Sequence, residues 1–190
     1  MKYLRPAISA LLFFTVLTGL AYPALITGLA QVLFPNQANG SLIRNNGQVI
    51  GSSLIGQEFK RPDYFWSRLS ATGDHQYNAL ASGGSNLSAG NPALADAVKA
   101  RLTALKKYPV PEGAVPVDLV TASASGLDPH ISPAAALYQT PRVALLRHLD
   151  PERLKALIQQ TTEAPLIGLI GEPRVNVLAL NRALDTLSGK

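Results

Sequence analysis

The sequence predicts a single N-terminal transmembrane α-helix followed by one α+β extracytoplasmic domain that contains a small antiparallel sheet and several helices. The first observation is an apolar run with no Asp, Glu, Lys, Arg or His between Pro6 and Ile43. The second is a hairpin signal directly after that run, and the third is a series of capped helix starts later in the chain. Because the expected strands come early and most helices come late, a regular alternation of parallel strands and helices is not expected.

The expected membrane span covers residues 7–34, which leaves a cytoplasmic N-terminus at residues 1–6 and an external domain at residues 35–190. A helix needs roughly 20 mostly apolar residues to cross a bilayer, and Ala7–Phe34 exceeds that length. Lys2 and Arg5 precede the run, and the next charged residue is Arg44. By the positive-inside rule, the N-terminus then lies in the cytoplasm and the domain lies outside it.

A cleaved signal peptide is the alternative interpretation of the same run. The small residues of Gly19-Leu20-Ala21 or Gly28-Leu29-Ala30 fit a cleavage site, which would place the mature start at Tyr22 or Gln31. The apolar region of a signal peptide usually has about 7–15 residues. Because apolarity here continues past both positions to Phe34, a retained anchor is favoured.

Four segments of the domain have the composition of strands. Ser41–Asn45 and Gln48–Ile50 flank Asn46-Gly47, a dipeptide that favours the type I′ turn of a hairpin. The aromatic run Tyr64–Trp66 is expected to be a strand, or the end of one, in the core. Val117–Thr121 is alternating and β-branched, which predicts another strand.

Four helices are expected after the first strands, each with a polar residue at its start. Asn91-Pro92 and Ser132-Pro133 both place a capping residue before a proline that fits the first helical position. The second of these helices extends to about residue 148, with a kink or a break expected at Pro141. Asp150-Pro151 begins the third helix, and Asn176 caps the last.

Composition and motifs exclude several classes of function. The chain of 190 residues has no cysteine, so it has no disulfide framework, Cys nucleophile or thiolate metal site. Its net charge of +5 comes without a basic stripe, which argues against nucleic-acid binding. Phosphate-binding loops, the H-E-x-x-H zinc motif and the G-x-S-x-G elbow are absent from the sequence. We therefore expect no catalytic, metal or cofactor-binding residue.

Two segments remain as candidate functional sites. Asp128, His130 and Ser132 lie close enough in sequence to suggest a hydrolase triad, but the same residue types shape a turn and cap a helix, and we favour that structural or partner-docking role. Gly83 and Gly84, with Asn86, form a loop whose backbone amides can cradle an anion or which can dock a partner. No Lys follows that loop to meet a phosphate, so docking is favoured.

A resemblance to a known family rests on the stretch VPVDLVTASASGLDPHISPAAALYQTPRVA, Val115–Ala144. This stretch is similar to the signature of the KdpC family, the small subunit of the bacterial Kdp potassium-transporting ATPase. The segments GSSLIGQEF, SGGSNLSAGNPAL and GEPRVNVLALNRALD also resemble that family, as does one N-terminal span at the matching distance. The resemblance therefore covers nearly the whole chain.

The resemblance implies a non-catalytic accessory subunit of a high-affinity, ATP-driven potassium uptake complex in the bacterial inner membrane. Its partners would be a channel-like potassium-selecting subunit, a P-type ATP-hydrolysing subunit and a very small single-span subunit, with membrane lipid around the anchor. ATP and potassium would be handled by those partners. The family is also described as raising the ATP affinity of the hydrolysing subunit, and from an external domain that effect has to pass through the membrane helices.

Two other functions stay open on the sequence alone. One is a membrane-tethered α+β hydrolase that uses Asp128, His130 and a serine. The other is a periplasmic module that binds a small ligand. Either of these proteins would be active alone, whereas an accessory subunit co-purifies with larger membrane proteins.

Overall fold

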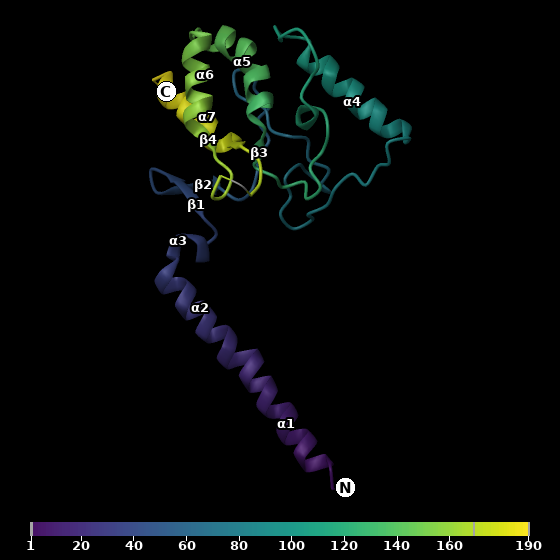
Figure 1. Cartoon of the computed structure of the whole chain (residues 1–190), viewed down its shortest axis with the longest axis vertical. Coiled ribbons are helices and arrows are strands. Elements are labelled where there is room, and N and C mark those ends of the chain that lie inside the picture. Colours follow the sequence, from purple (N-terminus) through teal and green to yellow (C-terminus); the bar gives the residue numbers. More distant parts are fainter. Residues whose placement is uncertain (1, 169, 190) are drawn as a thin grey trace. The chain divides into compact units, whose positions relative to one another are not determined.

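The computed structural model describes residues 2–168 and 170–189 of the chain. The chain divides into two compact units between Ser52 and Ser53, and each unit is described by itself. The first unit holds the N-terminal helix, a short second helix and a hairpin, and the second holds the later helices and a three-stranded sheet (Figure 1).

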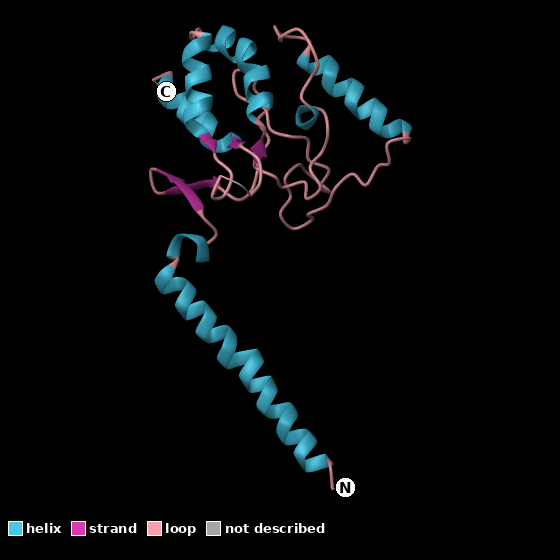
Figure 2. Ribbon diagram, in the orientation of Figure 1, coloured by secondary structure: helices cyan, strands magenta, loops and turns pink. Residues whose placement is uncertain are grey.

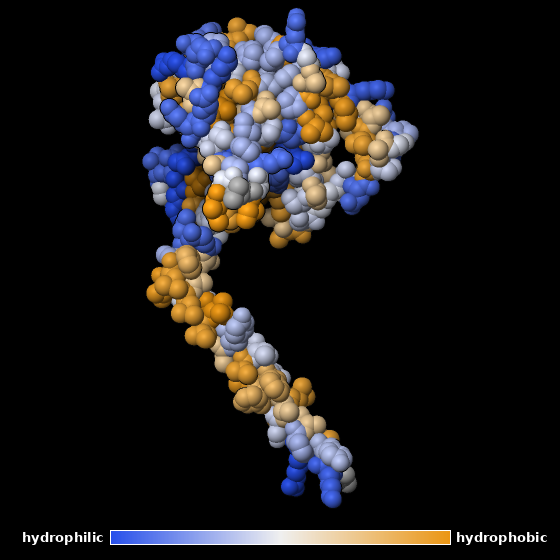
Figure 3. All heavy atoms as spheres, in the orientation of Figure 1, coloured by the Kyte–Doolittle hydropathy of each residue, from blue (hydrophilic) through white to orange (hydrophobic). Residues whose placement is uncertain are grey.

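The N-terminal helix is long and apolar enough to cross a membrane. It extends over Leu4–Leu33, 30 residues, and none of its side chains is buried. Figure 3 shows the apolar surface that it exposes along most of its length. Its three parts are α1 (Leu4–Val16), a π-helical turn (Leu17–Ala21) and α2 (Tyr22–Leu33). The wide turn directly precedes Pro23, whose ring and missing N–H disturb the regular bonding of the preceding turn.

The predicted hairpin is confirmed at the end of the first unit. A short helix, α3 (Pro35–Ala38), leads to β1 (Leu42–Asn45) and β2 (Gln48–Ser52), which pair antiparallel. The connecting residues have positive φ, 48° at Asn46 and 81° at Gly47. Both central positions of a type I′ turn require this left-handed conformation, which Asn and Gly adopt at low cost.

The second unit combines helices with a small antiparallel sheet, as the α+β prediction requires (Figure 2). Strand β5 is the middle strand of the sheet, between β3 and β4. Helices α5, α6 and α7 pack together and against β5. The elements are α4 (Pro92–Leu105), a 3-10 helix (Val117–Leu119), β3 (His130–Ile131), α5 (Pro133–Arg147), α6 (Pro151–Thr161), β4 (Thr162–Glu163), β5 (Arg174–Asn176) and α7 (Val177–Leu187).

All four predicted helix starts are confirmed, with the predicted capping residues. The side chain of Asn91 accepts a hydrogen bond from the backbone N–H two residues later, and Asp150 does the same. Ser132 and Asn176 accept from the backbone N–H three residues later. Each cap satisfies one of the donors that a helix start leaves without an intrahelical partner.

Two strand predictions were wrong. Val117–Leu119 forms a 3-10 turn, in which the N–H groups of Val120 and Thr121 bond back to the carbonyl of Val117. A tertiary contact outweighs the strand preference of this β-branched segment. In that contact, the carboxylate of Asp118 accepts the N–H of Ser132 at 2.7 Å. Tyr64–Trp66 belongs to the core but to no strand. The helix at Pro141 is not split, since α5 continues through that residue as one element.

The backbone at Phe65 and Trp66 is held by side-chain amides instead of by a neighbouring strand. Asn181 accepts the N–H of Phe65 and donates to its carbonyl, at 2.9 Å in both cases. Gln139 does the same for Trp66, at 2.8 and 3.1 Å. We call these four bonds the amide clamp. The clamp satisfies buried backbone groups that would otherwise need a sheet.

Candidate functional site

The candidate site is a cleft of about 650 Å³ in the second unit. Its wall includes Asp128, His130 and Ser132, so the structure brings the three predicted residues to one place. The 3-10 turn and the start of β5 form other parts of the wall. The remaining lining residues are Arg68, Pro116, Val117, Asp118, Ile131, Glu172, Pro173 and Arg174.

Asp128 organises the turn at the base of this cleft. One carboxylate oxygen accepts the backbone N–H of His130 at 3.0 Å, and the other lies 3.2 Å from a guanidinium nitrogen of Arg68. Burial by itself raises the pKa of the Asp128 carboxyl, but hydrogen bonds from His130 and the charge of Arg68 outweigh burial and leave that pKa lowered. The carboxylate is therefore ionised at neutral pH and fixes both the turn and the Arg68 side chain.

The imidazole of His130 lies between two carboxylates. Its Nδ1 is 3.4 Å from an oxygen of Asp128, and its Nε2 is 3.9 Å from an oxygen of Glu163. Glu163 in turn accepts a hydrogen bond from Arg174 at 2.9 Å. The Ser132 hydroxyl oxygen accepts the N–H of Ala135 at 3.0 Å. The arrangement is a series of polar and charged side chains that joins the turn to strands β4 and β5.

Gly83 and Gly84 lie against the chain segment that precedes Asp128, and Asn86 lies apart from that contact. The N–H of Gly83 donates to the carbonyl of Ser125 at 2.9 Å. A Cβ at Gly84 would lie 2.8 Å from the carbonyl oxygen of Ala124, closer than real Cβ contacts. Asn86 is exposed and has a positive φ of 52°. The glycines therefore permit a close backbone approach that supports the turn.

Adding one methyl group at Gly84 should destabilise the domain, whereas adding one at Gly83 should not. We expect Gly84→Ala to lower the free energy of unfolding by about 1–3 kcal/mol, the usual effect of overpacking. A Cβ at Gly83 meets nothing closer than 4.0 Å, so the effect of Gly83→Ala should stay within about 0.5 kcal/mol. Urea unfolding followed by the fluorescence of Trp66, the one tryptophan of the chain, measures both. Equal midpoints would contradict the close approach.

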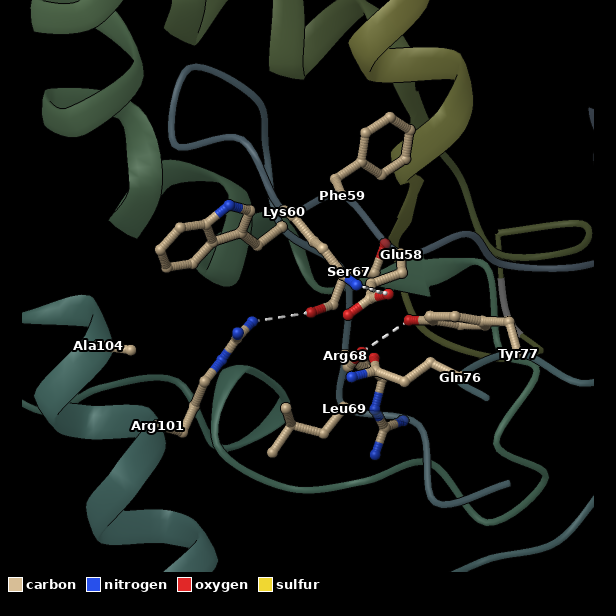
Figure 4. Close-up of a pocket in the computed structure, with 11 residues that line it drawn as sticks. Glu58, Phe59, Lys60, Ser67, Arg68, Leu69, Gln76, Tyr77, Arg101 and Ala104 are labelled. Carbon is tan, nitrogen blue, oxygen red and sulfur yellow. Dashed lines mark hydrogen bonds and ion pairs between the residues drawn. The ribbon is translucent and has the colours of Figure 1, made fainter. Parts of the chain in front are cut away.

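A second, smaller pocket of about 170 Å³ adjoins the same region (Figure 4). Several of its polar groups already bond to other parts of the protein. The guanidinium of Arg101 donates to the carbonyls of Ser67 and Leu119, at 3.1 and 2.9 Å, and Tyr77 donates its hydroxyl hydrogen to the carbonyl of Arg68 at 2.6 Å. The two bonds from Arg101 tie α4 to the chain at Ser67 and Leu119, which indicates a packed joint and not a ligand pocket.

Two arginines near this joint, the buried Arg142 and the half-buried Arg101, lie over the indole ring of Trp66. The guanidinium carbon of Arg142 is 4.0 Å from the ring centroid, and that of Arg101 is 5.1 Å away. Burial lowers the pKa of Arg142 to about 10 and lowers that of Arg101 as well. The sequence predicts Trp66 only as a core residue and gives no signal of its cationic neighbours.

Several residues of the cleft are not predicted by the sequence as site residues. Arg68, Asp118 and Glu172 lie outside the Asp128 turn in the sequence. Arg174 belongs to β5, and folding brings this strand next to β3. The β-branched pattern around Asp118 predicts a strand, although Pro116 two residues earlier favours a turn. Within residues 2–168 and 170–189, no group of three or more His, Cys, Asp or Glu side chains is placed to hold a metal ion.

Comparisons with known proteins extend over nearly the whole chain. Residues 4–186 match a family model described as KdpC, the c chain of the K⁺-transporting ATPase. The chain is 60% identical over 186 residues to the potassium-transporting ATPase KdpC subunit of Herpetosiphon aurantiacus, covering 97% of this chain and 96% of that protein. The KdpC subunits of Polaromonas naphthalenivorans and Variovorax paradoxus are 61% and 62% identical, with 97% and 96% of this chain and 94% and 95% of those proteins covered.

Proposed function

This chain belongs to the KdpC family of potassium-transporting ATPase subunits, and from that premise we propose that it acts by docking and stabilising its partners, without chemistry of its own. It is an accessory subunit of the potassium uptake complex. Its N-terminal helix of 30 residues fits a membrane anchor.

The docking proposal rests on Asp128 and Ser132, whose polar atoms are already bonded within the protein. Asp128 is engaged by Arg68 and by the backbone N–H of His130, and the oxygen of Ser132 caps α5. A nucleophile needs a neighbouring base that is free to take its proton. The Asp128 turn instead fixes the shape of an open, charged surface, which is what a docking role requires.

We propose that the partners are a potassium-selecting channel-like subunit, a P-type ATP-hydrolysing subunit and a very small single-span subunit. Those partners would bind potassium and hydrolyse ATP, while this chain holds them in a productive arrangement. Any influence on ATP affinity is then a coupling between distinct sites, carried by the assembled helices.

The proposed orientation places the N-terminus in the cytoplasm and the second unit outside it, at the bacterial inner membrane. Lys2 and Arg5 precede the apolar helix, and residues 6–43 carry no charge. Positive charge near the end of a span favours retention of that end in the cytoplasm. The cleft would then face extracytoplasmic surfaces of the partner subunits.

The proposal predicts that Asp128→Ala weakens assembly. Loss of the side-chain bond that closes a turn or caps a helix costs about 0.5–2 kcal/mol, so recovery of the complex should fall by roughly 2- to 30-fold under limiting conditions. Potassium-dependent ATPase activity should fall in the same proportion. Asp128→Asn keeps an oxygen that accepts the N–H of His130 and should retain most of the assembly. Co-purification of the full chain with its partners, with activity per assembled complex, measures both effects.

Asp150→Ala is the matched control for this experiment. Asp150 also precedes a proline, and it accepts the backbone N–H two residues later at 3.0 Å, as Asp128 does. It begins α6 and is absent from the lining of the cleft. Assembly of the Asp150→Ala protein should therefore match that of the unmodified chain. If the Asp128→Ala complex forms at full yield but does not turn over, or if the isolated chain hydrolyses ATP, the non-catalytic proposal fails.

A further inference from the structure

The turn between β4 and β5 exposes a cluster of large aliphatic side chains. Leu166, Ile167 and Ile170 are 67%, 82% and 64% exposed. We call these three residues the apolar tip. Figure 3 shows hydrophobic surface at the place where Figure 1 draws this connection. An exposed cluster of large apolar side chains on a protein surface often marks an interaction site.

The apolar tip is held in a defined shape. Leu166 and Ile170 exchange two backbone hydrogen bonds of 3.0 Å, and the N–H of Gly168 donates to the carbonyl of Pro165 at 3.0 Å. The following strand is anchored in the core, since Val175 is completely buried. The tip therefore presents its side chains from a closed turn, which lowers the entropy lost when they become buried in a complex.

Local structure does not explain why the tip is aliphatic. Ile167 has a φ of 57°, a left-handed conformation that β-branched residues rarely adopt and that Gly or Asn adopts at lower cost. Solvent exposure also favours a polar residue at that position. A surface that becomes buried against a partner accounts for both features.

The surroundings of the tip are charged and mostly acidic. Glu172 and Arg174 follow it directly and line the cleft, and Glu163 precedes it on β4. The cleft is lined by three carboxylates, on Asp118, Asp128 and Glu172, and by two guanidinium groups. Glu163 adds a further negative charge beside His130 and Arg174. Two of these four carboxylates are paired, Asp128 with Arg68 and Glu163 with Arg174, so the excess negative charge of this acidic surface comes from Asp118 and Glu172.

From this arrangement we propose that the apolar tip inserts into an apolar pocket on a partner subunit of the pump, and that Lys and Arg residues of the partner surround that pocket and face the acidic cleft. The inference rests on the docking function proposed above and names the surface and the chemistry of its partner. A lipid surface fits less well, because membrane-binding segments carry Lys and Arg that face anionic headgroups, whereas Glu163 and Glu172 flank this tip. An apolar centre with a charged rim is the usual organisation of a protein interface.

The first test measures binding of the purified full chain to the subcomplex of its partner subunits in detergent. A double variant, Leu166→Ser with Ile167→Ser, should bind roughly thirtyfold more weakly, the effect expected when an interface hot spot is lost. Leu80→Ser is the matched control, because Leu80 is 98% exposed in a different loop, and its affinity should be unchanged. The emission of Trp66 checks that each variant is folded. Equal binding by the double variant would overturn the inference.

The second test locates the occupant of the surface. The chain has no cysteine, so Ile167→Cys and Leu80→Cys each accept one polarity-sensitive dye. At position 167 the dye should shift to the blue and lose its quenching by iodide when the subcomplex is added, and at position 80 it should not. A shift in vesicles of phosphatidylglycerol and phosphatidylethanolamine without partner subunits would identify lipid as the occupant and overturn the inference.

The two proposals fail in different ways. If the unmodified chain does not bind the subcomplex, the docking function itself is wrong. If the unmodified chain binds and the tip variants bind equally well, only the assignment of the apolar tip is wrong.

Discussion

Replacing Gln139 by methionine should lower the free energy of unfolding of the second unit by about 3 kcal/mol. The two side chains have similar volume, so the change removes hydrogen bonds with little loss of packing. The N–H and carbonyl of Trp66 would both lose their partners in a site where Gln139 is 1% exposed. Each buried backbone group left without a partner costs about 1–3 kcal/mol. The Gln139 oxygen that accepts from Arg142 at 2.6 Å would be lost as well.

Gln159→Met makes the same chemical change at an exposed position of α6, and its effect should stay within about 0.5 kcal/mol. Urea unfolding of the full chain in detergent, followed by Trp66 emission, gives the difference between the two variants. If their midpoints coincide, the amide clamp contributes nothing to stability.

Replacing Arg147 by methionine should have an effect of similar size, again about 3 kcal/mol. The Arg147 side chain is 2% exposed and has one guanidinium nitrogen 2.8 Å from an oxygen of Asp185 and another 3.4 Å from an oxygen of Asp63. Removal of one member of a buried ion pair costs about 3–5 kcal/mol, because it leaves the other charge uncompensated. We expect a cost at the lower end of this range, because the Asp185 side chain is 31% exposed. A stacking contact of 4.4 Å with Tyr64 is also lost.

Arg153→Met provides the comparison for Arg147→Met, because Arg153 is exposed on α6. Unfolding of the Arg153→Met protein should match that of the unmodified chain. The double variant Arg147→Met with Asp185→Leu should recover part of the lost stability, since it removes the charge that Arg147→Met leaves unpaired. An unchanged penalty in the double variant would show that the charge left on Asp185 is not the cause of the lost stability.

These two sites explain how the cleft obtains a fixed shape. The amide clamp and Arg147 both hold the extended chain around Tyr64–Trp66 against α5 and α7. That extended chain continues to Arg68, whose guanidinium reaches Asp128 at the cleft. Loss of either site should therefore disturb the Asp128 turn as well as global stability.

Local features of the sequence determined the parts of the structure that depend on neighbouring residues. The hairpin followed from Asn46-Gly47, and the helix starts followed from capping residues, because a side chain two or three positions away satisfies the first free N–H groups. The long uncharged run predicted the apolar helix from length and composition. The Val115–Ala144 stretch indicated the family, which the comparisons confirm.

Tertiary contacts decided the features that local pattern predicted wrongly or missed. Val117–Thr121 has the composition of a strand, but the carboxylate of Asp118 binds the N–H of Ser132 and the segment turns instead. The aromatic run at Trp66 lies in the core without a strand partner, since Gln139 and Asn181 reach it from distant helices. The cleft forms only when Arg68, Asp128 and Arg174 meet in the folded chain. Sequence patterns report periodicity and capping within a few residues, whereas these contacts depend on which distant side chains satisfy buried polar groups.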